Sequence, residues 1–199
     1  MPAEQEVGLG LRERKKLRTR ATIREQAMRL FAEKGYGETT VEQIAEAAEI
    51  SPSTFFRYFP SKEQLVLVDD LDPIMIRAFQ EQPAELPVLT ALRRSMEQAF
   101  TDMSPEQFDR EQARQRLIRS VPELRAAQLD ELQRTIKMLA DGVAERLGRP
   151  RGDIESRAFA GAVVGTILGV LDDEHVFSLD RMGRALDLFE AGFPFEDER

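Results

Sequence analysis

Apolar residues recur at three- and four-residue steps along nearly the whole chain, and no useful stretch alternates apolar and polar residues as a strand would. A first helix is predicted over about residues 18–34, where Ile23, Ala27, Leu30 and Phe31 share one face. Two glycines follow within three residues of its end, as is common where a helix stops. The hydrophobic pattern therefore indicates helices, and it does so from the start of the chain.

Two short helices are predicted next. Thr40 and Gln43 have the spacing of a capping box, in which each side chain bonds a backbone N–H at the start of a helix. Ser51 is a good N-cap for the following helix, and Pro52 suits its first turn because the missing N–H has no partner there. Pro60 ends this helix, and a serine then opens a fourth one.

The remaining sequence predicts a larger helical unit, so the expected fold class is all-α. Its helices are expected at about residues 62–81, 87–102, 105–119, 122–147, 153–172 and 179–191, with proline or glycine at most of the breaks. The predicted organisation is a flexible basic arm over 1–17, a three-helix helix-turn-helix domain over 18–62, and a larger helical domain over 63–199.

The third helix has an outer face that suits DNA. If Phe55 and Phe59 face inward, the residues left on or near the surface are Pro52, Ser53, Thr54, Phe56, Arg57 and Tyr58. An exposed Phe56 is costly in water, but on DNA it can pack on sugar or on a thymine methyl group. Lys62 opens the fourth helix, where the helix dipole favours a phosphate contact. Two alternatives stay open: Phe56 as a core residue of a differently packed helix, and a helical module that binds protein instead of DNA.

The charge distribution favours DNA although the net charge is −8. Residues 11–20 carry six Arg or Lys and one Glu, whereas the whole of residues 1–62 has a balance of +2 and the remaining 137 residues have −10. One end of the chain can therefore approach a phosphate backbone that repels the rest. The basic stretch is interpreted either as an arm that reaches the minor groove or as a solvated helix start.

The segment TTVEQIAEAAEISPSTFFRYFPSKEQL, with the upstream RATIREQAMRLFAEKGYGETT, resembles the signature of the TetR family of bacterial transcription regulators. The resemblance covers roughly residues 18–68. It implies DNA contacts from Thr40, from Lys62 and from the outward residues of the third helix named above. The family usually has glycine in the turn where this chain has Glu49, so this residue is expected in a left-handed conformation.

The resemblance also implies a homodimer, usually a repressor, that binds a palindromic operator and is released by a small molecule. Independently, the segment ESRAFAGAVVGTILGVLDD has small residues at three- and four-residue steps that allow close helix packing. The predicted dimer interface comprises Gly161, Gly165, Gly169, Leu186 and Phe189. Packing of this helix inside its own domain is the alternative.

The middle of the chain also resembles, more weakly, actinobacterial regulators that sense acyl thioesters or other lipophilic metabolites. The expected effector is therefore a lipophilic metabolite such as an acyl thioester. Apolar residues of the middle helices are candidates for the pocket, although plain core positions are the competing interpretation. These candidates are Met75, Phe79, Leu92, Met96, Phe100, Phe108, Leu117, Leu132, Ile136 and Leu139.

Other chemistry finds little support in the sequence. There is no phosphate-binding loop and no nucleophile elbow, and nothing selects a catalytic pair from 36 Asp and Glu residues, so an enzyme is not expected. With no cysteine and one histidine, His175 among acidic residues, neither a metal nor another cofactor is predicted. No apolar stretch reaches the length of a membrane span, and the expected location is the cytoplasm.

Overall fold

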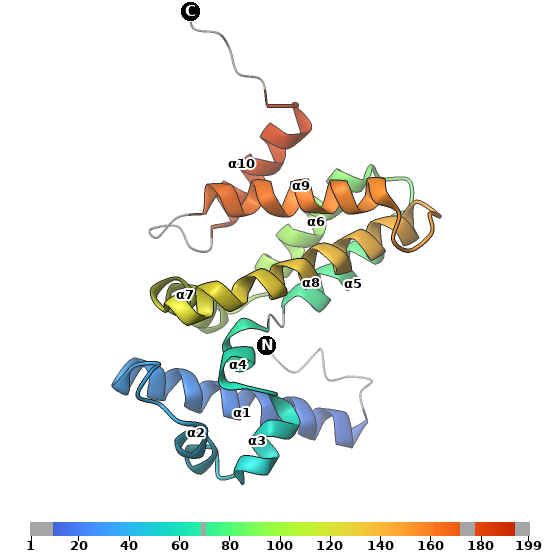
Figure 1. Ribbon diagram of the computed structural model, residues 1–199. Coiled ribbons are helices and arrows are strands. Elements are labelled where there is room, and N and C mark those ends of the chain that lie inside the picture. The colour runs from blue at the N-terminus through green and yellow to red at the C-terminus, as the bar shows by residue number, and fades with distance from the viewer. Residues whose placement is uncertain (1–9, 69–70, 172–177, 194–199) are drawn as a thin grey trace, which may run out of the picture. The chain divides into compact units, whose positions relative to one another are not determined.

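The computed structural model describes residues 10–68, 71–171 and 178–193, and every regular element in these ranges is an α-helix (Figure 1). In chain order they are α1 Leu11–Lys34, α2 Val41–Ala47, α3 Pro52–Tyr58, α4 Lys62–Leu67, α5 Leu71–Gln80, α6 Val88–Thr101, α7 Pro105–Ser120, α8 Pro122–Arg146, α9 Ile154–Val170 and α10 Leu179–Glu190. The predicted fold class is confirmed, and His175 lies outside the described residues.

Two helix boundaries differ from the prediction. Helix α1 begins at Leu11 and not near Arg18, so the last part of the expected flexible arm is helical. The residues concerned are mostly Arg, Lys and Leu, which favour helix even without an apolar stripe. The helix expected over 62–81 is two helices, because Val68 has extended backbone. At this break the Arg24 guanidinium donates hydrogen bonds to the carbonyls of Leu65 (3.2 Å) and Val68 (3.1 Å).

The chain divides into two compact units, and the first comprises the residues up to Val68 together with Val121–Ala127. Its core is formed by fully buried side chains of α1 to α4, among them Ile23, Ile44, Phe55 and Phe59. The first turns of α8 belong to this unit, and Leu124 is completely buried. The division at Val68 lies six residues beyond the expected boundary, because the apolar side of α4 completes the first core.

The second unit contains α5, α6, α7, α9, α10 and most of α8. Its core cluster is formed by Phe79, Ala91, Leu92, Met96, Leu139, Ala140, Val143, Ala160, Val163, Met182 and Leu186. Helix α10 packs against both α9 and α6. Among the described residues, no helix has the length and hydrophobicity needed to cross a membrane.

Candidate nucleic-acid interface and ligand cavity

Helix α2 begins at Thr40 with the predicted capping box. The Thr40 hydroxyl accepts a hydrogen bond from the Gln43 backbone N–H (3.3 Å), and the Gln43 side-chain oxygen accepts one from the Thr40 N–H (3.1 Å). Thr40 itself is exposed. Since capping uses the oxygen as an acceptor, the hydroxyl proton stays available to a phosphate oxygen.

The turn between α2 and α3 is closed by backbone hydrogen bonds from Glu49 to the Glu46 carbonyl (3.0 Å) and from Ile50 to the Ala45 carbonyl (2.9 Å). Glu49 has φ = 55°, which confirms the predicted left-handed conformation at this position. A residue with a Cβ is strained there by roughly 1 kcal/mol. The glutamate is exposed, so it places a negative charge beside the start of α3.

Helix α3 divides its side chains between the core and the surface as predicted. Ser51 caps it by accepting from the Thr54 N–H (3.1 Å), and Phe55 and Phe59 are 0% and 1% exposed. On the outer side Phe56 is 51% exposed, with its ring edge on Phe55 at 5.5 Å between centroids. Of the other predicted contact residues, Pro52, Ser53 and Arg57 are exposed, and Thr54 and Tyr58 are half-buried.

Arg20 of α1 fixes the carboxyl end of α3. Its guanidinium donates to the Tyr58 carbonyl (3.3 Å) and lies 4.4 Å from the centroid of the Phe59 ring. A cation over an aromatic face is attracted by the ring quadrupole, and the hydrogen bond fills one of the carbonyls that a helix end leaves unpaired. Helix α3 is thus held at both ends, by Ser51 and by Arg20.

The Lys62 side chain already has partners within the protein, unlike a lysine that binds only a phosphate. Its ammonium donates to the carbonyls of Tyr36 (2.8 Å) and Thr39 (3.0 Å) and lies 4.1 Å from the centroid of the Tyr36 ring. The start of α4 is therefore tied to the turn between α1 and α2. An ammonium has three donors, so one is left for DNA, and the phosphate contact stays a prediction.

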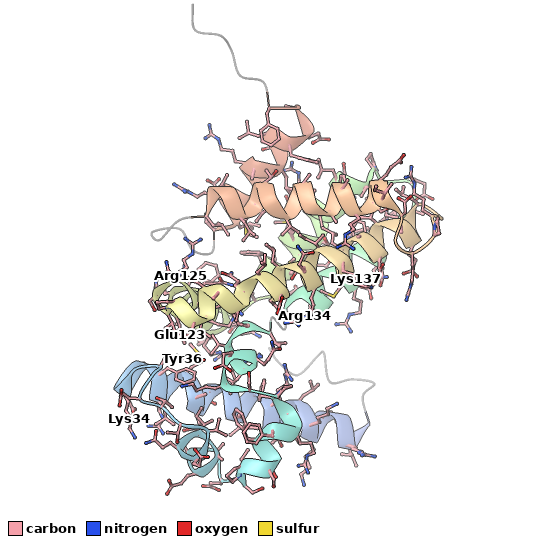
Figure 2. All side chains as sticks on the ribbon, viewed as in Figure 1. Lys34, Tyr36, Glu123, Arg125, Arg134 and Lys137 are labelled. Carbon is pink, nitrogen blue, oxygen red and sulfur yellow. The ribbon has the colours of Figure 1, made fainter. Side chains whose placement is uncertain are left out.

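Tyr36 and Glu63 complete this corner of the first unit. Burial raises the pKa of Tyr36 above its ordinary value, and the negative charge of Glu63 raises it further. Hydrogen bonding to Ser61 holds the pKa of Glu63 below its usual range. At neutral pH the corner therefore contains a neutral phenol and a carboxylate. Figure 2 shows Tyr36 beside Glu123 at the start of α8.

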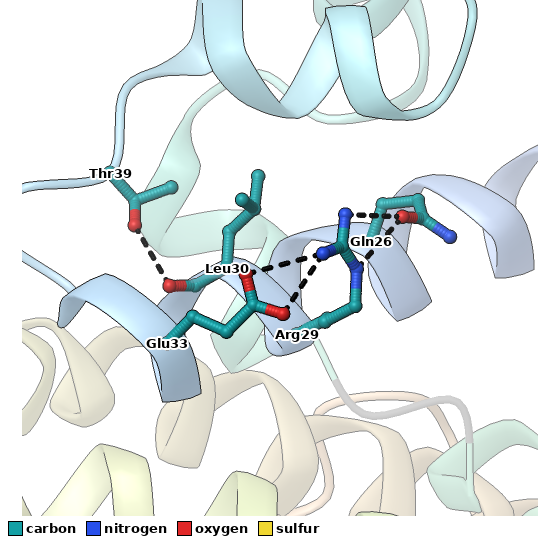
Figure 3. Close-up of polar contacts among 5 residues, drawn as sticks. All are labelled: Gln26, Arg29, Leu30, Glu33 and Thr39. Carbon is teal, nitrogen blue, oxygen red and sulfur yellow. Dashed lines mark hydrogen bonds and ion pairs between the residues drawn. The ribbon is translucent and has the colours of Figure 1, made fainter.

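Thr39 is a structural residue that the sequence analysis did not single out. It is 1% exposed, and its hydroxyl contacts the carbonyls of Leu30 (3.3 Å) and Gly35 (2.8 Å), which follows the end of α1 (Figure 3). On the surface of α1, Arg29 bonds both Gln26 and Glu33. The doubled threonine before the capping box was the only available signal, since its partners depend on how the chain turns.

The second unit contains a small apolar cavity of about 60 Å³. It is lined by Met75, Ile76, Leu92, Met96, Thr135, Met138, Leu139, Val163, Val164 and Ile167. Of the predicted pocket residues, Met75, Leu92, Met96 and Leu139 line it, whereas Phe79, Phe100, Phe108, Leu117, Leu132 and Ile136 do not. Phe79 is fully buried and packs in the core, which is the competing interpretation given above.

The predicted dimer residues separate into two groups. Gly165 and Gly169 are exposed and Gly161 is half-buried, and a Cβ built on any of them meets no described atom of this chain within 4 Å. Leu186 is 0% exposed and packs in the core of its own unit, so its assignment to the interface was wrong. Phe189 is half-buried against Phe159, with 5.8 Å between the ring centroids.

The fold and the capped helix pair define a class, that of the helix-turn-helix DNA-binding regulators. Residues 23–68 match the family model described as bacterial regulatory proteins of the tetR family, and residues 86–194 match the MftR C-terminal domain of TetR-type regulators. The chain belongs to the TetR family and is a DNA-binding transcriptional regulator.

Relatives and solved structures agree with this family. The chain is 34% identical to the HTH-type transcriptional regulator TcmR of Streptomyces glaucescens, over 91% of this chain and 83% of that protein. It is 28% identical to the putative mycofactocin biosynthesis transcriptional regulator MftR of Mycobacterium tuberculosis, over 96% and 97%. Among solved structures, the fold resembles a SmeT–triclosan complex, with a TM-score of 0.57, 20% identity and coverage of 91% and 99%; SmeT is a repressor from Stenotrophomonas maltophilia. It also resembles Thermus thermophilus FadR in complex with lauroyl-CoA, with a TM-score of 0.50, 22% identity and coverage of 89% and 96%.

Proposed function

We propose that this regulator binds a palindromic operator as a homodimer in the cytoplasm, represses transcription there, and is released by a lipophilic effector in its second unit. The observation that carries DNA recognition is the outer face of α3. A helix of seven residues, capped by Ser51, presents Phe56 and Arg57 to the surface while Phe55 and Phe59 hold it to the core. A short helix of this kind enters the major groove with its outer residues on base edges.

The proposed contacts have separate roles. Ser53, Thr54 and Arg57 suit hydrogen bonds to bases or phosphates, and Pro52, Phe56 and Tyr58 suit apolar contacts with sugars or thymine methyl groups. Thr40 and Lys62 suit phosphates, since each lies at the start of a helix and retains a donor proton. Phosphate contacts fix the position of the first unit along the duplex, and base contacts select the DNA sequence. Below, the part of the first unit formed by α1 to α4 is called the head.

The test is a titration of full-length protein with the duplex upstream of its own or a neighbouring gene, at several salt concentrations. We expect steeply salt-dependent binding, and we expect Arg57→Ala to weaken operator binding by about 1–3 kcal/mol with no change in oligomeric state. Arg110→Ala, at an exposed site in the second unit, is the matched control. Failure of the parent to bind any duplex at low salt would favour the rival function, a helical module that binds protein.

The small-residue face of α9 supports the homodimer. Its glycines are not required by contacts within the chain, while Ile154 and Leu168 on the same helix are 80% and 39% exposed. A face that is smooth and partly apolar suits close packing against a second copy across a two-fold axis. A dimer also presents two heads, which is what a palindromic operator requires.

Two neighbouring features support an effector with an apolar chain and an anionic head, as in an acyl thioester of coenzyme A. The apolar cavity shares Ile76 and Met138 with an open groove of about 370 Å³. The charged residues that line this groove are three cations, Arg134, Lys137 and Arg151, and two carboxylates, Asp141 and Glu145. Arg151 has no ion-pair partner among the described residues, although Lys137 pairs with Asp141 at 2.6 Å. Three methionines line the cavity, and their flexible side chains can re-pack around an inserted chain.

The effector is tested by adding lauroyl-CoA to the operator complex. We expect release of DNA, with the uncharged dodecanol much less effective at the same concentration. If neither compound binds, the cavity is ordinary core and the lipophilic effector is wrong, whereas the DNA function is unaffected.

A further inference from the structure

Helix α1 extends for about three turns beyond the helix-turn-helix head. Its first fully buried residue is Ile23, which is also where the family match begins. The twelve residues before it, 11–22, span about 18 Å as a helix. None of the described side chains from Leu11 to Arg18 is fully buried, and the contacts with α3 begin only at Arg20, so packing in the first unit accounts for little of this stretch.

The extension is strongly cationic. Between residues 11 and 20 it carries six Arg or Lys and one Glu. The side chains of Arg12, Lys15 and Lys16 are exposed and have neither a hydrogen bond nor an ion pair within the described part of the chain. Arg12 lies three and four residues from the two lysines, so like charges repel along the helix. A polyanion that neutralises them removes this repulsion.

Two of these side chains, Arg12 and Lys16, continue the face of α1 that packs in the first unit, and Lys15 borders that face. Lys16 lies seven residues and Arg12 eleven residues before Ile23, so all three lie on one side of the helix. In the head this side packs with α2, and at the junction Arg20 bonds the Tyr58 carbonyl at the end of α3. Within the first unit, α2 and α3 lie on the same side of α1, below it in Figure 1. The basic face is therefore directed toward the side where the recognition helix lies.

We propose that residues 11–22 are a DNA-backbone clamp, in which Arg12, Lys15 and Lys16 bind phosphates next to the half-site that α3 contacts. The inference rests on the proposed operator binding and adds a second surface to it. A helix of about 18 Å is long enough to reach several phosphates, since each strand carries one phosphate per about 3.4 Å of duplex axis. Phosphates are the same at every sequence, so the clamp adds affinity and no selectivity.

The experiment compares parent and the triple variant Arg12→Gln, Lys15→Gln, Lys16→Gln as full-length dimers on an operator and on an unrelated duplex. Glutamine keeps a good helix former at all three positions. We expect operator affinity at about 0.1 M salt to fall at least tenfold, and the slope of log K against log salt to become shallower by about two to five, which corresponds to one to three phosphates per protomer. Affinity for the unrelated duplex falls by a similar factor, so the ratio of the two is preserved.

Two further variants separate the clamp from other effects. Arg94→Gln, Arg110→Gln, Arg116→Gln removes three charges from the second unit, and we expect it to bind like the parent. Arg12→Lys, Lys15→Arg, Lys16→Arg keeps the charge, and we expect it to bind like the parent too. The clamp is overturned if the glutamine variant matches the parent in affinity and slope, or if the control variant falls equally. In either case the parent still binds its operator, so the proposed function survives.

Discussion

The ammonium of Lys62 donates hydrogen bonds to the carbonyls of Tyr36 and Thr39, so the first residue of α4 stabilises the turn after α1. In the proposed complex the same residue also contacts a DNA phosphate. Both acceptors are main-chain groups of the loop that leads into α2. The side chain therefore links three helices of the first unit. A role in DNA contact alone does not require these bonds.

For this reason we expect Lys62→Met to lower the free energy of unfolding of the first unit by about 1–3 kcal/mol, because it leaves two carbonyls without their donor. Thermal unfolding followed by circular dichroism measures the loss. Lys34→Met, at an exposed position of the same unit, is the control and should change little. Equal stability of Lys62→Met and the parent would mean that the ammonium serves the phosphate only.

Glu49 gives a second prediction at this scale. At φ = 55° glycine is unstrained, so Glu49→Gly should raise the free energy of unfolding by up to about 1 kcal/mol, the gain being reduced by the greater freedom of glycine in the unfolded chain. Urea unfolding measures it. Glu46→Gly, in the helical conformation of α2, should show the opposite sign by about 1 kcal/mol. If the two variants lose stability alike, the turn is not strained.

Among the helices, features that depend on residues nearby in the sequence, such as caps, could be predicted from the sequence. Features that depend on residues far apart in the sequence, such as burial and cavity lining, could not. The caps at Thr40 and Ser51 depend on neighbours three residues away, so their spacing is enough to find them. Leu186 has the same apolar character as an interface residue, and only the packing of α10 on α6 and α9 shows that it is buried in its own unit. Six of the ten pocket candidates do not line the apolar cavity, because helical periodicity gives a buried face without saying which part of it borders a cavity.

Helix α9 carries the element-scale prediction. Gly165→Glu should leave the protomer folded, since the glycine is exposed and its Cβ position is open, yet it places a charge in the proposed interface. We expect sedimentation velocity to show monomers where the parent is a dimer, and operator affinity to fall with the dimer. Ala113→Glu, exposed on α7, is the matched control and should stay dimeric. A dimeric Gly165→Glu would place the interface elsewhere.

On the scale of the whole molecule, the basic stretch lies in the DNA-binding part of the chain and the acidic excess lies in the rest. The cations are concentrated in α1 and the body is acidic, with −10 over residues 63–199. A phosphate backbone attracts one unit and repels the other, so the charges favour one orientation of the protein on DNA. The low overall pI of about 4.9 reflects the acidic majority of the chain and does not reveal the basic stretch of α1.

The proposed effector response gives a prediction that involves both units. Val163 is 1% exposed and lines the apolar cavity, so Val163→Phe should fill it at a cost of about 1–3 kcal/mol in stability. We expect the variant to bind its operator and to stay bound when lauroyl-CoA is added. Leu129→Phe, at a 61% exposed site of α8, should be released like the parent. Normal release of Val163→Phe would show that the effector binds outside this cavity.

Helix α8 belongs to both units, and this limits how the chain can change its length. Leu124 is buried in the first unit, while Thr135, Met138 and Leu139 border the cavity in the second. Inserting one residue between Ala127 and Thr135 would turn every later side chain of α8 by about 100° relative to Leu124 and advance it by 1.5 Å. A change of length in this segment therefore alters the angle between the two buried sides of one helix, which a change of length in a loop does not do.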